Sequence, residues 1–360
     1  MTAGFFSAGQ DPEEQDASRE RIQRGGIPLA AEERLRALGG EGAMFTSGLS
    51  VSEFSLLRRL GPRPIAHVMG ASVVRPAPQL LPALAPGQAN LVVGRAYGPQ
   101  VVGASSWNRI TDASPSQVFN YKWHTEVICQ LDVLTAAWDT ARRRALARLT
   151  QEAQEVGADA VAGVHLRRGE HDFGGRTVQY VVSGTAIRLG ESQRDERPTL
   201  MDLSVQDLWR LDRAGYDAVG LLAASVVVFA SPPTATRLRR RRSPRQNQEL
   251  GELSQGFQLA RGVLRERLRG QVADARADGA VGVEFMHEVQ REKLSLASSL
   301  GSLDRRGWHL GRFGIPYYVS GRGEAERRGW MITMHASGTA VTRRRAGVDD
   351  VKTALRIGAR

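Results

Sequence analysis

Residues 130–166 read QLDVLTAAWDTARRRALARLTQEAQEVGADAVAGVHL, and this stretch decides the fold. Its apolar residues recur at intervals of three and four positions, the spacing that places side chains along one face of an α-helix. The helical pattern stops at Gly157, and the apolar run ADAVAGVHL (158–166) follows it. The stretch therefore predicts a long amphipathic helix that leads into a β-strand.

The same pattern occurs a second time, 119 residues further along the chain. The apolar stripe of the first helix consists of Leu131, Leu134, Trp138, Ala141, Ala145, Leu149, Ala153 and Val156. The stripe of the second helix consists of Leu250, Leu253, Phe257, Ala260, Leu264, Leu268, Val272 and Ala275. The strand that follows is repeated as well, because ADGAVGVEF (277–285) matches ADAVAGVHL. This agreement predicts an internal repeat.

A matching helix start precedes each copy. LSVSEFSLLRRLG (49–61) matches LSVQDLWRLDRAG (203–215), and Ser50 and Ser204 are candidate N-caps. An acidic residue follows each serine by three positions, as in a capping box. The glycine that closes each motif predicts the end of the helix, because glycine readily takes the left-handed conformation found there.

Apolar strands complete each copy. The first helix leads into PIAHVMGASVV (64–74), and the second leads into AVGLLAASVVVF (218–229). The closing strands TVQYVVSGTAIRL (177–189) and MITMHASGTAVTR (331–343) share the sequence SGTA. Each copy thus has the order helix, strand, long helix, strand, strand.

Short strands with one face covered by a helix predict a two-layer α/β sandwich. We therefore expect an α+β protein made of two tandem sandwiches, each with an antiparallel sheet. The expected division is a disordered N-terminal arm at 1–45, a first domain at 46–190 with an insertion at 75–128, a second domain at 199–343 with an extended hairpin at 287–330, and a basic tail at 344–360.

The residues quoted above carry a family resemblance. LSVSEFSLLRRLG…PIAHVMGASVV, the stretch QLDVL…GVHL and SGTAIRL resemble the YbjQ-like family of putative heavy-metal-binding domains. The second copy is similar through NQELGELSQGFQLARG, ADGAVGV and SGTAV. The resemblance covers residues 46–190 and 199–343. It implies small α+β units of dodecin-like topology that assemble into rings, typically pentamers, and its name implies the alternative function of binding a metal or a small ligand.

One short segment could supply metal ligands. WHTEVIC (123–129) places His124, Glu126 and Cys129 within six positions. On a loop that enters a helix, an imidazole, a carboxylate and a thiolate could meet at one metal ion. The alternative is that Cys129 is a small buried residue, while His124 and Glu126 lie on the loop surface. No other cofactor is predicted.

The net charge of +11 comes almost entirely from arginine. One dense basic cluster, RLRRRRSPR (237–245), contains Arg237, Arg239, Arg240, Arg241, Arg242 and Arg245. Such a cluster could bind nucleic acid or another polyanion by neutralising phosphates, although no aromatic residue interleaves it for base stacking. The alternative is a solvated linker in a protein whose genome favours arginine codons.

Catalytic motifs do not stand out. The sequence has no serine elbow, HExxH motif or phosphate-binding loop, so we expect a protein that is not an enzyme. The leading hypothesis is self-assembly or binding of a protein partner through exposed sheet edges and the two insertions, which carry most of the aromatic residues. No apolar run is long enough to span a bilayer, and the single cysteine and the lack of a secretory signal favour the cytoplasm.

Overall fold

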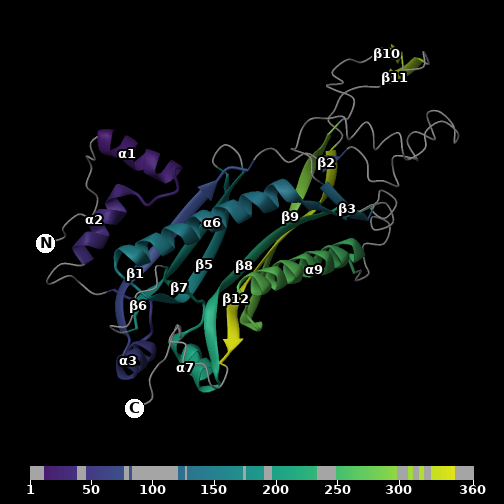
Figure 1. The fold of residues 1–360 in the computed structure, drawn as a ribbon. Coiled ribbons are helices and arrows are strands. Elements are labelled where there is room, and N and C mark those ends of the chain that lie inside the picture. Colours follow the sequence, from purple (N-terminus) through teal and green to yellow (C-terminus); the bar gives the residue numbers. More distant parts are fainter. Residues whose placement is uncertain are drawn as a thin grey trace.

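Figure 1 shows the computed structural model of the chain. It describes residues 12–38, 46–76, 81–82, 121–125, 128–172, 176–189, 197–232, 249–297, 307–310, 316–319 and 326–344. The architecture is α+β, as predicted. Each of the two larger sheets is antiparallel except for one short strand at its edge, which pairs in parallel.

The first half of the fold contains the five predicted elements. They are α3 (Val51–Leu60), β1 (Arg63–Val74), α6 (Asp132–Glu155), β5 (Ala160–Asp172) and β6 (Arg176–Arg188). The strands form a sheet in the order β1-β6-β5, and both pairings are antiparallel. The long helix α6 lies along one face of this sheet (Figure 1).

The second half follows the same order of elements. They are α7 (Val205–Arg213), β8 (Tyr216–Ala230), α9 (Gly251–Asp274), β9 (Gly279–Ala297) and β12 (Glu326–Arg343). Its strands lie in the order β8-β12-β9, again antiparallel, so that the closing strand is central in both sheets. The helix α9 packs on the face of this sheet that points away from α6.

Short strands connect the two halves and extend their sheets. β7 (Thr199–Leu200) pairs in parallel with β5, and β4 (Ile128–Leu131) pairs with β8. The remaining short strands are β2 (Leu81–Pro82), β3 (Tyr121–Thr125), β10 (Gly307–Leu310) and β11 (Pro316–Val319). β3 and β4, at the end of the predicted insertion 75–128, thus extend the sheet of the other half. The arms of the predicted hairpin 287–330 remain paired from β9 to β12 as far as Ser295 and Glu326.

Both helix starts have the predicted caps. The hydroxyl of Ser50 accepts a hydrogen bond from the backbone N–H of Glu53, whose carboxylate accepts one from the backbone N–H of Ser50. Ser204 accepts from the backbone N–H of Asp207 in the same way. Such a cap stabilises a helix by about 1 kcal/mol because it satisfies an N–H group that has no partner inside the helix.

Matching polar contacts occur in the two halves at counterpart positions, 119 residues apart in the long helices and 154 residues apart in the first and closing strands. Buried Glu152 of α6 accepts from the backbone N–H of Met69, and Gln271 of α9 accepts from that of Ala223. The carboxylates of Asp159 and Asp278 each accept a backbone N–H from the end of the closing strand of their own half. These aspartates therefore have a structural role between the long helix and the following strand of each half.

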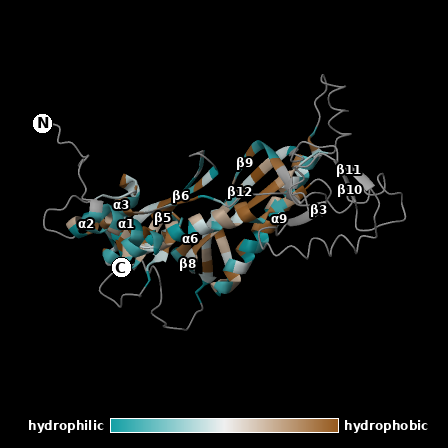
Figure 2. Cartoon of the chain, turned by 90° about the horizontal axis from the view of Figure 1, so that it is seen from above, coloured by the Kyte–Doolittle hydropathy of each residue, from teal (hydrophilic) through white to brown (hydrophobic). Residues whose placement is uncertain are grey.

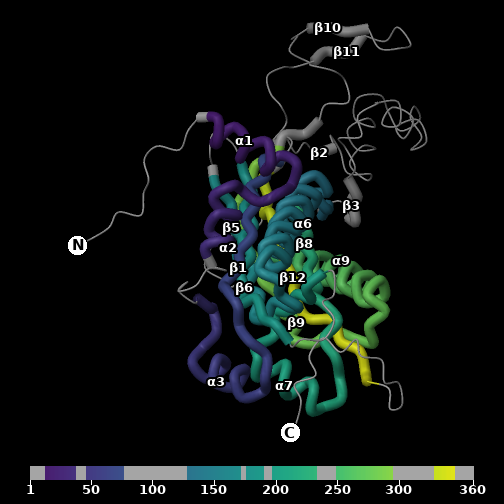
Figure 3. The backbone as a smooth tube through the Cα atoms, turned by 60° about the vertical axis from the view of Figure 1, so that its left-hand side comes forward, coloured from purple at the N-terminus to yellow at the C-terminus, as the bar shows by residue number. Residues whose placement is uncertain are grey.

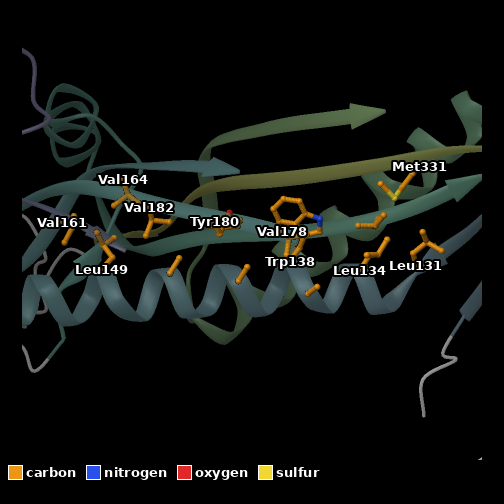
Figure 4. Packing of buried hydrophobic residues seen from close by; sticks show 14 of the residues in the cluster. Leu131, Leu134, Trp138, Leu149, Val161, Val164, Val178, Tyr180, Val182 and Met331 are labelled. Carbon is orange, nitrogen blue, oxygen red and sulfur yellow. The ribbon is translucent and has the colours of Figure 1, made fainter. Parts of the chain in front are cut away.

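The core of the first half extends into the second. The predicted helix stripe is buried at Leu134, Trp138, Ala141, Ala145, Leu149 and Ala153. Figure 4 shows Trp138 and Leu149 pointing from α6 toward the strands, with Met331 of β12 nearby. Val227 and Phe229 of β8 belong to the same cluster, so one apolar core joins the two halves.

The N-terminal region differs from its prediction. Residues 1–45 are expected to be disordered, but the structure forms α1 (Pro12–Gln23) and α2 (Leu29–Leu38) within them. Ile27 and Leu35 are buried, and Arg34 forms an ion pair of 2.8 Å with Glu152 of α6. The two helices are largely hydrophilic (Figure 2), so a few apolar contacts and one ion pair position them, and composition alone misses this.

Within the described part of the chain, none of the helices has the length and apolar character needed to cross a membrane.

Candidate functional site

The predicted metal ligands lie mostly outside the described residues. Cys129 belongs to β4, and its side chain is completely buried in the core that joins the halves. The side chain of His124 and the whole of Glu126 lie outside the described residues. Across the ranges that the structure describes, no three histidine, cysteine, aspartate or glutamate side chains gather into a possible metal site. The described residues therefore do not fit a heavy-metal ion, and the three-residue site stays a prediction.

The basic cluster at 237–245 also lies outside the described residues, which stop at Pro232 and resume at Glu249. Its arginines Arg237, Arg239, Arg240, Arg241, Arg242 and Arg245 therefore have no structural description. Polyanion binding through this segment stays a prediction, as does the cytoplasmic location.

A buried histidine lies where the two halves meet. His335 of β12 packs edge-on against Trp138 of α6, with ring centroids 4.7 Å apart, and its Nδ1 lies 2.9 Å from the hydroxyl of Ser225. Burial, together with the positive charges of Arg168 and Arg142, lowers the pKa of His335 to about 3. The imidazole is therefore neutral at physiological pH, and its role here is packing and one hydrogen bond.

An ion pair crosses the same region. Arg267 of α9 donates to the carboxylate of Asp139 of α6 at 2.9 Å and to the carbonyl oxygen of Ser225 at 2.8 Å. Its counterpart Arg148 donates to the carbonyl oxygen of Ala71 in the first half. The other guanidinium nitrogens of Arg148 donate to the carbonyl oxygens of Ile22 in α1 and Gly26 in the turn after it, rather than to an acid of the other long helix. Each arginine thus donates to a carbonyl oxygen in the first strand of its own half, but their remaining partners differ.

A further contact between the halves is the junction, defined as residues 199–205 with residue 159 and residues 160–164 of β5. Within it, Met201 N–H donates to the carbonyl of Val161 at 3.0 Å, and Val164 N–H donates to the carbonyl of Met201 at 2.9 Å. Gly163 N–H donates to the carbonyl of Leu203 at 3.1 Å. The start of the second half thereby adds a parallel strand to the sheet of the first half.

Helices α3 and α7 complete the junction at one end of the molecule (Figure 3). The carboxylate of Glu53 in α3 accepts from the backbone N–H of Val205, and Ser52 accepts from the side chain of Gln206. Val205 is only 1% exposed, and it packs in a cluster with Leu57 and Met201. The junction therefore combines strand pairing, a shared helix cap and an apolar contact.

The sheet of the second half has an open edge, defined as residues 279–289 of β9. On this side β2 pairs only with Leu296 and Ala297, and no other described strand pairs with β9 beside β12. Four large apolar side chains on this strand are 37–45% exposed: Val283, Phe285, Met286 and Val289. Unpaired backbone groups beside exposed apolar side chains form a ready template for another strand, and natural edges usually avoid this combination.

Another exposed apolar residue lies near the start of the first half. Val51, the first residue of α3, is 84% exposed, whereas its counterpart Val205 is buried. Sequence reasoning predicts exposed sheet edges in general but identifies neither β9 nor Val51. The signal that could have found them is the repeat itself, because aligned apolar residues that differ in exposure mark a surface that is covered in one copy only.

Comparisons with known proteins agree with the observed fold plan. Residues 125–190 match the family model YbjQ_1, described as putative heavy-metal-binding. The match begins at the last residue of β3 and ends two residues after β6. The chain is also similar to the encapsulin nanocompartment protein Rv1762c of Mycobacterium tuberculosis, with 28% identity over 246 residues. That alignment covers 67% of this chain and 77% of the relative. No solved structure matches the chain significantly.

The family match includes α6, β5 and β6, which form the core of the first half, and it does not reach the second half. The predicted resemblance to the YbjQ-like family is thus confirmed for residues 125–190, which match its family model.

Proposed function

We propose that the protein is a non-enzymatic structural component that works by self-assembly. In this proposal residues 46–190 and 199–343 are two tandem units of dodecin-like topology, joined by the junction. The open edge of β9 is the surface through which copies of the chain associate. The matching strand orders and polar contacts of the two halves support the tandem arrangement.

The exposed strand β9 is the observation that carries the proposal. Val283, Phe285, Met286 and Val289 expose 37–45% of their surface on a strand whose outer edge has no described strand partner over residues 279–289. Burying four such side chains would contribute several kcal/mol at about 25 cal/mol per Å² of apolar surface. This driving force favours association with another protein surface.

The relative named as an encapsulin nanocompartment protein supports the same direction. Its name associates it with a compartment, and the similarity extends over two thirds of the present chain. We propose that this chain shares a capacity for assembly, with a second copy of the chain as its first partner.

Light scattering coupled to size exclusion tests the proposal. The wild-type chain, of 39.3 kDa, should elute at micromolar concentration with a mass that is a multiple of this value. Phe285→Lys should lower the average mass without lowering the melting temperature, because Phe285 is 41% exposed and a lysine on an edge strand opposes pairing.

Ala273→Lys on α9 is the matched control, because it adds the same charge at an exposed helix position. It should leave the mass unchanged. A wild-type protein that stays monomeric throughout the micromolar range would refute the proposal.

A further inference from the structure

The junction is a contact between the start of the second half and the edge of the sheet of the first half. Because the chain is repeated, each of the two segments that form this contact has a counterpart elsewhere in the chain. The first side is the segment that precedes α7, and its counterpart precedes α3. The second side is the edge of β5, and its counterpart is the edge of β9. Within the described residues, the segment before α7 pairs with the edge of β5, whereas the segment before α3 and residues 279–289 of β9 have no such strand partner.

The segment that precedes α3 is held by its own half in the same way as the segment in the junction. Gly48 N–H donates to the hydroxyl of Thr185 at 3.0 Å, and its counterpart Asp202 N–H donates to the hydroxyl of Thr339 at 3.3 Å. The caps that follow have matching backbone angles, φ −66° and ψ 161° at Ser50 and φ −64° and ψ 159° at Ser204. The segment at 46–51 therefore has the conformation that pairs with a sheet edge in the junction.

The edge of β9 has the shape of the edge that accepts such a segment. In β5 a bulge at Gly163, with φ +59°, turns two N–H groups outward to the carbonyls of Met201 and Leu203. In β9 the ladder to β12 shifts at the same place, and Gly282 has φ +65°. A left-handed angle at both positions favours glycine, and both edges have a glycine there, so they share the same bulge.

The side chains of the two edges differ in exposure, as expected if the edge of β9 lacks the partner that covers β5. Val164, beside the bulge in β5, is 3% exposed, whereas its counterpart Val283 is 39% exposed. On the other side of the contact, Val205 is 1% exposed and its counterpart Val51 is 84% exposed. Val164 and Val205, which the junction buries, thus have apolar counterparts that remain accessible, whereas the buried Met201 has the polar Ser47 as its counterpart.

We infer that the edge of β9 in one copy binds residues 46–51 of the next copy and so repeats the junction between molecules. By the repeat, Ser47 N–H donates to the carbonyl of Ala280, Val283 N–H to the carbonyl of Ser47, and Gly282 N–H to the carbonyl of Leu49. Val51 then occupies the place that Val205 has within one chain, with Asp207 in the position of Glu53.

This inference rests on the proposed function and specifies its polarity. Donor and acceptor are different surfaces of the chain, so the contact is heterologous and each added copy presents a new open edge. The competing arrangement is direct pairing of two β9 edges across a two-fold axis, which uses one surface twice. The inference concerns the strand contact alone. Arg267 also binds Asp139 of the other half, but its counterpart Arg148 is already bound to α1 and the turn after it, so this second contact is not repeated between copies.

Cysteine cross-linking distinguishes these arrangements. Thr46 and Ala280 are the counterparts of Leu200 and Val161, which are register partners in the junction. Purified Thr46→Cys/Ala280→Cys protein is treated with a bismaleimide that has a short spacer, and the products are separated on a denaturing gel. We expect a ladder of dimers, trimers and larger species, because each copy carries both a donor and an acceptor cysteine.

The single variants and an internal pair serve as controls. Thr46→Cys alone and Ala280→Cys alone should give no ladder, and wild-type protein, whose Cys129 is buried, should give none. Ser52→Cys/Gln206→Cys, at positions whose side chains meet on the surface of the junction, should cross-link within one chain. This pair shows that the reagent reacts across the junction.

Three outcomes would overturn the inference. If Ala280→Cys alone forms dimers, two β9 edges pair with each other and self-assembly survives without the head-to-tail contact. If light scattering shows assembly but the double variant gives no ladder, another surface holds the copies together. If light scattering shows only monomers, the proposed function fails together with the inference.

Discussion

Val51 and Val205 start the same motif, LSV, at counterpart positions of the two halves, yet one is 84% exposed and the other is 1% exposed. Their helices have the same kind of cap and the same backbone angles at the cap residue. The difference comes from what lies beside them. Val205 packs against the first half of its own chain, whereas no described residue of another unit covers Val51. Burial here is a property of the neighbour and not of the local sequence.

The largest expected effect comes from placing a charge at both valines. Val205→Asp should lower the free energy of unfolding by about 3–5 kcal/mol, because it buries a carboxylate that has no cationic partner in the apolar cluster. Val51→Asp should change the unfolding free energy of the monomer by less than about 0.5 kcal/mol, because the side chain is exposed and an acid suits the first turn of a helix. Urea denaturation of both variants measures the two values.

The same pair sharpens the comparison in assembly. Val51→Asp should reduce the mass seen by light scattering even though it leaves the fold intact, because our inference buries Val51 against the next copy. If Val51→Asp keeps the wild-type mass, residue 51 lies outside any contact between copies.

A smaller, pH-dependent effect is expected at the seam between the halves. His335 has a pKa of about 3 in the folded protein and about 6.5 when unfolded, so the unfolded chain binds more protons between these values. Its contribution to stability is therefore complete above pH 6.5 and is lost as the pH falls toward 3, by up to about 1.4 kcal/mol per pH unit.

The variant His335→Phe retains a ring against Trp138 but cannot bind a proton. The slope of unfolding free energy against pH, between pH 6 and 4, should be shallower in this variant than in wild type. Equal slopes would mean that His335 is not the group that loses stability in acid. Val181, the counterpart of His335, shows that the first half lacks this sensitivity at the same strand position.

The repeated elements could be predicted from sequence because their signals are local. The apolar stripe of α6, the caps at Ser50 and Ser204, and the buried strand β8 all follow from spacing within a dozen or so residues. The helices α1 and α2 could not, because a charged composition conceals the few contacts that hold them, such as Arg34 with Glu152.

The candidate site is harder to predict for a different reason. β7 has only two residues, Thr199 and Leu200, and so gives no periodic signal, although it pairs the start of the second half with β5 of the first. The open edge of β9 has a similar sequence to the covered edge of β5, since GAVGV (279–283) and AVAGV (160–164) share the glycine of the bulge and the valine after it. Which edge is covered depends on the order of units along the chain, and only coordinates show this.

Hydrogen exchange at the two bulges tests the central claim most directly. In protein that light scattering shows to be assembled, the amides of Gly282 and Val283 should exchange as slowly as those of Gly163 and Val164, which are hydrogen-bonded within the junction. Dilution to the monomer should accelerate exchange in the peptide covering 279–284 and leave the peptide covering 160–165 unchanged. Fast exchange at Gly282 and Val283 in the assembled protein would contradict the claim that the junction is repeated between copies.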